Sequence, residues 1–255
     1  MPDPLAGLVW PLSPLATAWC ALALTVGYAV RGVAGFGAGV FAAPLLAFTM
    51  PMTTIAPLIT LLGLTASVRQ AFRGWREIAW KAVLRFVPGT FIGVPLGLWA
   101  VKNVDQELLI RLLGAYVVAY ALWSLFGERL LGRALTMPDW VVHPLGIGGA
   151  LIATLFGGLA GPLYVTYFDS LGLAKGVFRV TVSTTLLTLS VVRSIGYLAA
   201  GVFRAEDFML VGAALLPAGI GTLVGEWVHD RIAPEMFRRC VGVLLALSGS
   251  ALLFR

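Results

Sequence analysis

The stretch RGVAGFGAGVFAAP, at residues 31–44, places four glycines within eight residues and decides how the chain is expected to fold. It lies inside apolar sequence, because no Asp, Glu, Lys or Arg occurs between Arg31 and Arg69. A glycine in a helix interior costs about 1 kcal/mol relative to alanine. A helix that reaches this stretch should therefore break or end there.

The rest of the chain is apolar enough for many such helices. Of its 255 residues 59% are hydrophobic and 12% are charged, and the mean hydropathy is +0.93. Soluble domains carry about a quarter charged residues, and about 20 apolar residues suffice to span a bilayer. The sequence predicts an all-α integral membrane protein. Its net charge of +6 then indicates basic cytoplasmic loops rather than a nucleic-acid partner.

Internal similarity indicates that the chain is built from two related parts. GFGAG at 35–39 matches GGLAG at 157–161, and TLLGLTASVR at 60–69 matches TTLLTLSVVR at 184–193. A third register, shifted by 128, gives the matched pairs Arg76/Arg204, Ile92/Ile220, Gly93/Gly221, Gly97/Gly225, Trp99/Trp227, Glu107/Glu235, Arg111/Arg239, Gly114/Gly242, Leu125/Leu253 and Phe126/Phe254. Internal repeats of this kind are common in transporters.

The repeat predicts a first part at 1–130 and a second part at 131–255, each with transmembrane helices and the second inverted. Each part should hold about five helical segments, of which the first two are short and are broken at the glycine-rich stretch. They are two short crossings or one re-entrant hairpin. The predicted segments are 13–31, 38–50, 53–72, 82–101, 108–126, 142–157, 160–169, 177–200, 208–228 and 237–254.

Loop charges orient the two parts. The loop after 53–72 is strongly basic and is expected to be cytoplasmic, whereas its counterpart near 193–207 is weakly charged and external. The basic residues of the first loop are Arg69, Arg73, Arg76, Lys81 and Arg85, against Glu77 alone. The bias reverses at the next pair of loops, as an inverted repeat requires. The N-terminus is therefore predicted outside and Arg255 inside.

The paired glycine breaks could form an anion site. FGGLAGP at 156–162 repeats the design of the first break, and Pro162 can begin the next helix. Two inverted breaks would bring two helix N-termini toward a shared centre, where free N–H groups and the positive dipole end favour an anion. The alternative is close helix packing by small residues.

Arginines strengthen the anion hypothesis. Arg193 has thirteen uncharged residues before it and ten after it, so it is the best candidate for an interior cation. Arg31 lies beside the first break, Arg179 follows the second, and Arg69 matches Arg193 in the repeat. The alternative for each is that the side chain reaches the headgroups. All twelve acidic residues fall in loops or near segment ends, so no buried carboxylate is expected to carry a cation.

Backbone N–H groups around Gly37–Gly39 and Gly158–Gly161 are expected to hold the anion's oxygens. The predicted substrate-binding residues are Arg31, Gly35, Phe36, Gly37, Gly39, Gly158, Gly161, Pro162, Tyr164, Arg179 and Arg193. The aromatic members could instead be core residues. No metal, cofactor or catalytic residue is expected, because His143 and His229 lack zinc-ligand spacing and no activated serine is evident.

Three motifs carry a family resemblance: GVAGFGAGVFAAPLL in the first part, and GGLAGPLYV and VFRVTVSTTLL in the second. With them the chain resembles the sulfite exporter TauE/SafE family from about Leu22 to Phe254, and WRE at 75–77 is also similar. Leu159 and Ala160 depart from the glycine-richer run common there. The resemblance implies export of sulfite or of small organosulfonates such as sulfoacetate or sulfolactate.

The resulting hypothesis is a secondary transporter that exports a small sulfur-containing anion across the cytoplasmic (inner) membrane by alternating access. The alternatives are an anion channel, or a transporter for another small oxyanion or a carboxylate. The expected partners are the small anion and the lipid bilayer. The sequence leaves open which anion is carried, the coupling ion, and the oligomeric state, a homodimer included.

Overall fold

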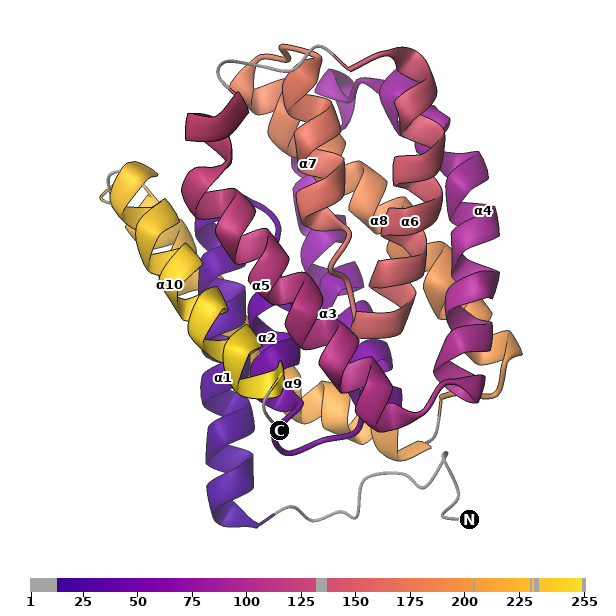
Figure 1. Ribbon diagram of the computed structural model, residues 1–255, viewed down its shortest axis with the longest axis vertical. Coiled ribbons are helices and arrows are strands. Elements are labelled where there is room, and N and C mark those ends of the chain that lie inside the picture. Colours follow the sequence, from indigo (N-terminus) through magenta and orange to yellow (C-terminus); the bar gives the residue numbers. More distant parts are fainter. Residues whose placement is uncertain (1–12, 132–136, 204, 230, 232–233, 254–255) are drawn as a thin grey trace. The chain divides into compact units, whose positions relative to one another are not determined.

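The computed structural model describes residues 13–131, 137–203, 205–229, 231 and 234–253, and within these ranges it contains helices and no strand (Figure 1). This confirms the all-α class. The α-helices are α1 (Pro14–Ala34), α2 (Ala38–Leu46), α3 (Met52–Arg73), α4 (Trp80–Asn103), α5 (Gln106–Leu131), α6 (Val142–Phe156), α7 (Gly161–Ser170), α8 (Lys175–Ala199), α9 (Ala205–His229) and α10 (Pro234–Leu253), with short 3₁₀ turns η1 (Trp75–Glu77) and η2 (Asp139–Val141).

Six helical stretches in the described part are long and apolar enough to cross a membrane. They are Pro14–Ala34, Trp80–Asn103, Gln106–Ser124, Asp139–Phe156, Gly176–Ala199 and Asp207–Val228. In contrast, α2 has nine residues and α7 has ten. At 1.5 Å per residue they are about 14 and 15 Å long, roughly half of the hydrocarbon core. Neither short helix can span the bilayer.

Glycine caps end the helices that precede these short ones. The α1 helix begins where the Ser13 hydroxyl accepts a hydrogen bond from the Ala16 N–H, and it ends at Gly35, which has φ +82° and donates its N–H to the Arg31 carbonyl. Gly157 ends α6 in the same way, with φ +78°. The predicted first segment, 13–31, agrees with α1 to within three residues. The expectation that it is short is wrong, because α1 has 21 residues and is long enough to cross a membrane.

Each short helix folds back along the helix before it. The indole Nε1 of Trp19 in α1 donates to the Leu45 carbonyl in α2 across 2.8 Å, which pairs the start of one with the end of the other. The Tyr164 hydroxyl in α7 donates to the Gly146 carbonyl in α6 across 3.3 Å. The returning arm is too short to cross, whereas the arm before it, Pro14–Ala34 or Asp139–Phe156, is long enough to do so. A pair of short crossings is therefore not what the helix lengths give, and a re-entrant hairpin stays a prediction.

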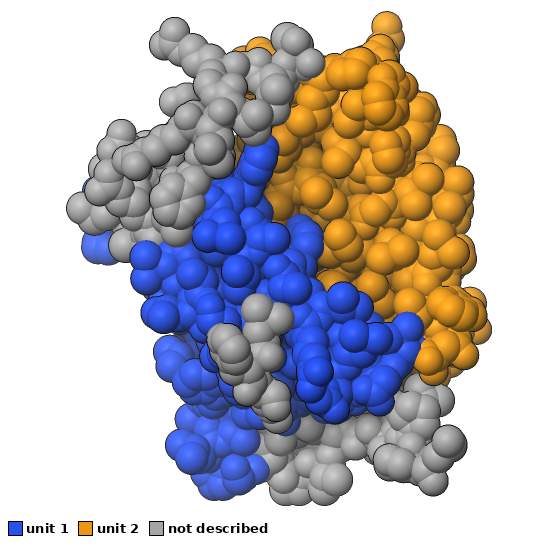
Figure 2. Space-filling view, viewed as in Figure 1, with its two compact units in different colours: residues 1–55, 104–133, 213–255 blue, residues 56–103, 134–212 orange. Residues whose placement is uncertain are grey.

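The helices form two compact units, coloured separately in Figure 2. Unit 1 comprises residues 1–55, 104–133 and 213–255, and unit 2 comprises residues 56–103 and 134–212. Each unit therefore combines helices from both parts of the sequence. The division into two inverted repeats at residue 130 stays a prediction.

Close packing at glycines holds each unit together. In unit 2, a Cβ on Gly93 or Gly97 of α4 would collide with α6, at Ile147 and Thr154 respectively. In unit 1, a Cβ on Gly221 or Gly225 of α9 would collide with backbone carbonyls of α1. These glycines are matched pairs in the 128-residue register, so the same small-residue contact occurs once in each unit.

Candidate functional site

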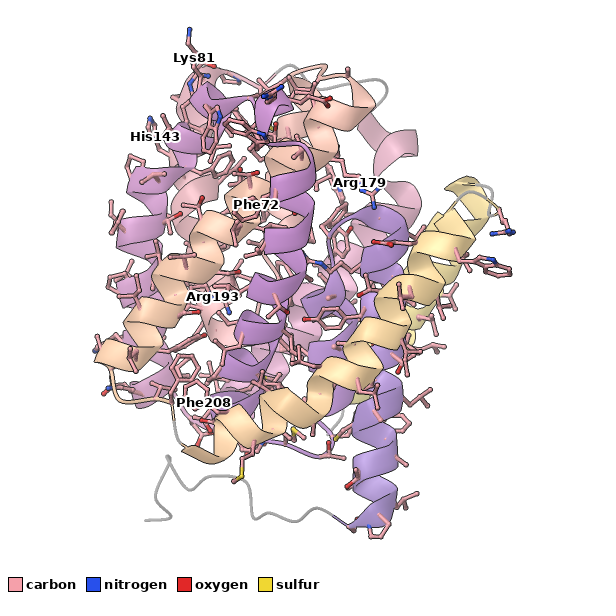
Figure 3. The ribbon with its side chains drawn as sticks, turned by 180° about the vertical axis from the view of Figure 1, so that it is seen from behind. Phe72, Lys81, His143, Arg179, Arg193 and Phe208 are labelled. Atoms are coloured by element: carbon pink, nitrogen blue, oxygen red, sulfur yellow. The ribbon has the colours of Figure 1, made fainter. Side chains whose placement is uncertain are left out.

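The centre of the candidate site is Arg193, in unit 2 on α8, whose side chain is only 1% exposed. It is labelled in Figure 3. A guanidinium that reached the headgroups would lie at the surface of the unit, so burial argues against that alternative. A buried charge costs several kcal/mol unless partners compensate it. The surroundings of Arg193 therefore decide what it does.

Three elements surround the Arg193 guanidinium. Its Nη2 donates to the Thr60 hydroxyl of α3, and its Cζ lies 5.8 Å from the ring centroid of Tyr197, one turn further along α8. Its Nη1 lies 3.8 Å from the position that a Cβ on Gly158 would occupy, so it faces the second glycine break. Tyr197 is fixed in turn by donating its hydroxyl to the Thr154 carbonyl of α6.

Two buried polar groups at this point lack partners within the described part of the chain: the Arg193 Nε and the hydroxyl of the adjacent Ser194. No carboxylate of the described residues lies within ion-pair distance of Arg193. A buried donor without an acceptor costs about 1–3 kcal/mol, more for a charged group. An anion beside Arg193 would supply both the missing acceptor and the missing charge.

The second glycine break lies next to this arginine. Gly158 has φ +108°, and because it carries no side chain, the space beside Nη1 that a Cβ would occupy is left free. Gly161 and Pro162 are the first two residues of α7 and are both buried. Gly158 lies in the turn before α7, and Gly161 and Pro162 begin that helix. Of these three predicted residues, Gly158 lies beside the Arg193 guanidinium.

Tyr164 has a packing role. Its hydroxyl bonds to Gly146, its ring occupies the space where Gly149 would carry a Cβ, and its centroid is 4.4 Å from that of Phe86. The alternative that this tyrosine is a core aromatic accounts for all of these contacts.

Arg179 lies on the same helix as Arg193 but fourteen residues earlier, which is about 21 Å along the axis. It is exposed and lies above Arg193 in Figure 3. One small anion cannot contact both side chains at once. Arg193 itself is six residues, or about 9 Å, from the end of α8, midway between that end and the helix centre.

The remaining predicted residues lie in unit 1 at the first break. Arg31 is 8% exposed on α1, and the Tyr28 hydroxyl one turn earlier is buried without a partner in the described part of the chain. The break itself consists of the following residues: Gly35 with φ +82°, the half-buried Phe36, Gly37 with φ +94°, and Gly39 in the first turn of α2. That both breaks serve one anion stays a prediction.

Sequence reasoning missed several groups. Thr60 and Ser194 are ordinary residues in apolar runs, and the 124-residue register aligns Thr60 with Thr184 rather than with Arg193.

The expectation of no buried carboxylate is also wrong, because Asp207 is 9% exposed in the first turn of α9. An acidic residue there is favoured by the helix dipole. It would have been found by asking which acids begin a helix.

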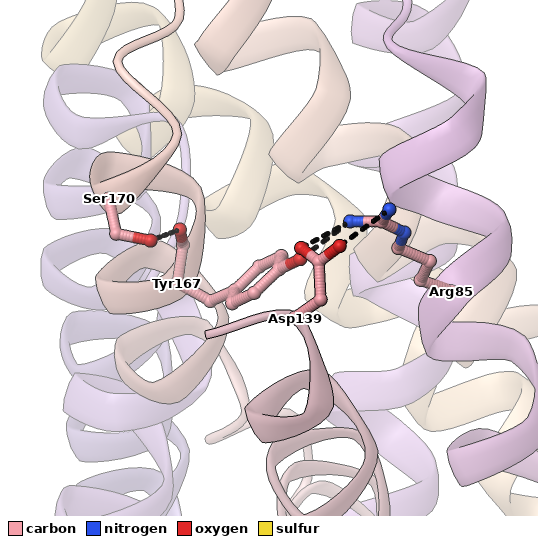
Figure 4. Close-up of polar contacts among 4 residues, drawn as sticks. All are labelled: Arg85, Asp139, Tyr167 and Ser170. Carbon is pink, nitrogen blue, oxygen red and sulfur yellow. Dashed lines mark hydrogen bonds and ion pairs between the residues drawn. The ribbon is translucent and has the colours of Figure 1, made fainter. Parts of the chain in front are cut away.

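Arg85, expected in a loop, lies on α4 and ties the second hairpin to that helix (Figure 4). Its two terminal nitrogens donate to the Asp139 carboxylate at 2.8 and 3.1 Å, and Nη1 also donates to the Tyr167 hydroxyl at 3.3 Å. Asp139 precedes α6 and Tyr167 is on α7. One side chain thus links both arms of the hairpin.

Among the described residues, no group of three His, Cys, Asp or Glu side chains could hold a metal ion. A sequence model of the family described as "Sulfite exporter TauE/SafE" matches residues 19–252. The chain belongs to the sulfite exporter TauE/SafE family. This confirms the family resemblance read from the glycine motifs, and with its six candidate spans the chain is a multi-pass membrane transporter.

A relative in this family is the "Probable inner membrane transporter protein TsaS" of Comamonas testosteroni. It is 28% identical over 196 residues, which cover 76% of this chain and 81% of that protein. No solved structure matches the chain. The family match over residues 19–252 covers both parts of the sequence, including the hairpins.

Proposed function

We propose that this TauE/SafE protein is a secondary transporter that exports a small sulfur-containing anion, sulfite or an organosulfonate such as sulfoacetate, across the inner membrane by alternating access. The observation that carries the proposal is the buried Arg193 with its unpartnered Nε and no carboxylate of the described residues beside it. The family description and the name of the TsaS relative support the substrate class and the membrane.

The chemistry of the site suits an oxyanion. A sulfite or sulfonate group presents three oxygens, and a guanidinium can donate two N–H bonds to such a group in one plane. The Arg193 Nε is available as a donor. Thr60 would keep the guanidinium in place from α3, and Gly158 would leave space for the ligand.

Counterflow in proteoliposomes tests the proposal. Vesicles loaded with unlabelled sulfoacetate or sulfite should accumulate the labelled anion from outside when they contain the wild-type protein. Arg193→Gln should abolish this exchange, because glutamine removes the charge while keeping a polar side chain. Rapid anion current without exchange would replace the transporter by a channel.

Arg111→Gln is the matched control, because Arg111 is an exposed arginine paired with Glu107 on α5. It should leave counterflow unchanged. Equal exchange by wild type and Arg193→Gln would overturn the proposed site. Exchange of acetate in preference to both sulfur anions would overturn the proposed substrate class.

A further inference from the structure

One side of α8 carries polar residues at several points along the helix, interrupted by the buried Leu186. With about 100° of rotation per residue, four side chains of residues 179–192 lie within about 80° of Arg193 on this side, whereas Val182 and Leu189 lie on its other side. From the N-terminal end they are Arg179, Ser183, Leu186 and Ser190. Ser183 is 0% exposed and Ser190 is 7% exposed, so the hydroxyls lie inside the unit. We call Arg179, Ser183, Ser190 and Arg193 the polar stripe.

The α3 helix lies antiparallel to this face. Thr60 near its start bonds to Arg193 near the end of α8, and Gly74 after its end lies against Val180 near the start of α8. On α8 the polar stripe falls in the arc between Arg193 and Val180. Both ends of that arc contact the α3 segment, so the stripe faces α3.

Gly63 opens space opposite the stripe. The antiparallel register places it across from Ser190, on the same face of α3 as Thr60. Gly63 is buried, yet a Cβ built on it would have no atom within 4 Å beyond its neighbours and the local helix backbone. Gly148 and Gly219 also have open space beside them, but they are not buried, whereas the buried Gly93 and Gly97 are tightly packed. The buried Gly63 thus has unfilled space beside it, on the face of α3 that carries Thr60.

The exposed end of the polar stripe, at Arg179, lies beside other positively charged side chains. The turn between α3 and α4 packs on the start of α8, where the Ala79 N–H donates to the Thr181 hydroxyl at 3.1 Å. That turn carries the exposed Arg76, Lys81 is exposed in the first turn of α4, and Arg179 is exposed at the same end of α8. Glu77 is the acidic residue in this turn, so positive charge predominates and would concentrate anions there.

We propose that the anion reaches Arg193 along the polar stripe, entering at Arg179 from the side of the basic turn and passing Gly63 between α3 and α8. The path is about 21 Å long, with a cation at each end and hydroxyl groups between. Arg179 captures the anion and does not hold it at the final site. This inference rests on the proposed function, because it assumes that Arg193 binds the anion.

Charge-selective cysteine labelling tests the path. In a background with Cys20→Ala and Cys240→Ala, the variants Gly63→Cys and Ser190→Cys are each treated with a negatively charged sulfonatoethyl and a positively charged trimethylammonioethyl thiosulfonate. The anionic reagent should react at least about tenfold faster at both positions, since the arginines attract anions. Sulfoacetate should slow the reaction at Ser190→Cys.

Gly148→Cys is the control, because Gly148 is also a glycine inside a helix of unit 2 with open space beside it, but on α6. It should react without charge preference. Equal rates with the two reagents at Gly63→Cys and Ser190→Cys, or rates no higher than at the control, would overturn the path.

A transport measurement adds a second criterion. Gly63→Leu should fill the open space and slow counterflow at least about tenfold, whereas Gly148→Leu should not. Unchanged counterflow in Gly63→Leu would overturn the path. If the labelling pattern holds while neither the wild type nor Arg193→Gln exchanges sulfur anions, the proposed function fails and the path stands. If Arg193→Gln exchanges sulfur anions as fast as the wild type, Arg193 is not the binding site at which the path ends. If labelling shows no preference while Arg193→Gln abolishes exchange, the path alone fails.

Discussion

The two hairpins share a backbone design and differ in how an arginine is supplied. Both breaks begin with a glycine of positive φ that caps the preceding helix, Gly35 in unit 1 and Gly157 in unit 2. In unit 1 the buried Arg31 belongs to the capped helix itself, and its carbonyl accepts the cap hydrogen bond. In unit 2 the buried Arg193 comes from α8 and faces the break from outside.

This difference indicates that the two breaks share a backbone fold and differ in which helix supplies the buried arginine. Helix caps and close glycine contacts recur in both units because they determine whether the backbone can pack. An arginine from a following helix faces the break in unit 2, where Arg193 lies beside Gly158. Among the described residues, no arginine lies beside the Cβ position of Gly37, the second glycine of positive φ in unit 1. Function is therefore expected to be unequal between two parts of similar structure, and substitutions at paired positions can test this.

The largest effect is expected at the glycines that both units share. Gly93→Leu and Gly221→Leu each force a side chain into the backbone of a neighbouring helix, at a cost at or above the upper end of about 1–3 kcal/mol. Both should lower Tm in detergent by about 6 °C or more. Gly219→Leu on α9 has open space and should change Tm little. A large fall in Tm for only one of the two variants would show that the glycine contacts of the two units are not equivalent.

The next effect should separate the two arginines. Arg193→Gln should weaken sulfoacetate binding about 10- to 100-fold, because it removes charge-assisted hydrogen bonds worth about 1.5–3 kcal/mol. Arg31→Gln should weaken it less than about threefold. Calorimetric titration of the purified proteins measures both. Equal losses in the two variants would show that the units contribute alike and would contradict the comparison.

Alanine at the second glycine of positive φ in each break should act on stability in both units. Gly37 has φ +94° and Gly158 has φ +108°, where a Cβ is strained by about 1–2 kcal/mol. Gly37→Ala and Gly158→Ala should both lower Tm by a few degrees. Gly158→Ala alone should also weaken anion binding, because its methyl group approaches Arg193. Weaker binding in Gly37→Ala would assign the first break to the site as well.

The smallest effect is expected for the exposed ion pair. Asp139→Asn removes a salt bridge of which both side chains are largely exposed, and exposed pairs contribute little. Thr17 stands at the position that matches Asp139 in the 122-residue register. The expected fall in Tm is below about 3 °C, with transport unchanged. A larger fall would make the link between Arg85 and the hairpin a distinguishing feature of unit 2.

The sequence predicted the helices and the breaks well because their signals are local. Apolar runs and glycine clusters placed the ten α-helices of the described residues within a few residues. The end of α1 was predicted too early, at residue 31, because an arginine in the sequence resembles a helix boundary even when it is buried. The partners of Arg193 could not be predicted in this way. Thr60 reaches it through tertiary packing of residues more than 130 positions apart, which no local pattern encodes. Arg193 itself could be predicted, because it is a charged residue within a long uncharged stretch of the sequence.

The composition of the two units has a consequence for biosynthesis. The ribosome delivers α4 with its glycine face before the α6 helix that covers this face exists, and the glycines of α9 meet an α1 that was made about 190 residues earlier. Unit 2 has all its helices once residue 212 has emerged, whereas unit 1 holds both ends of the chain and must wait for α10. A nascent chain that stops at residue 130 can complete neither unit.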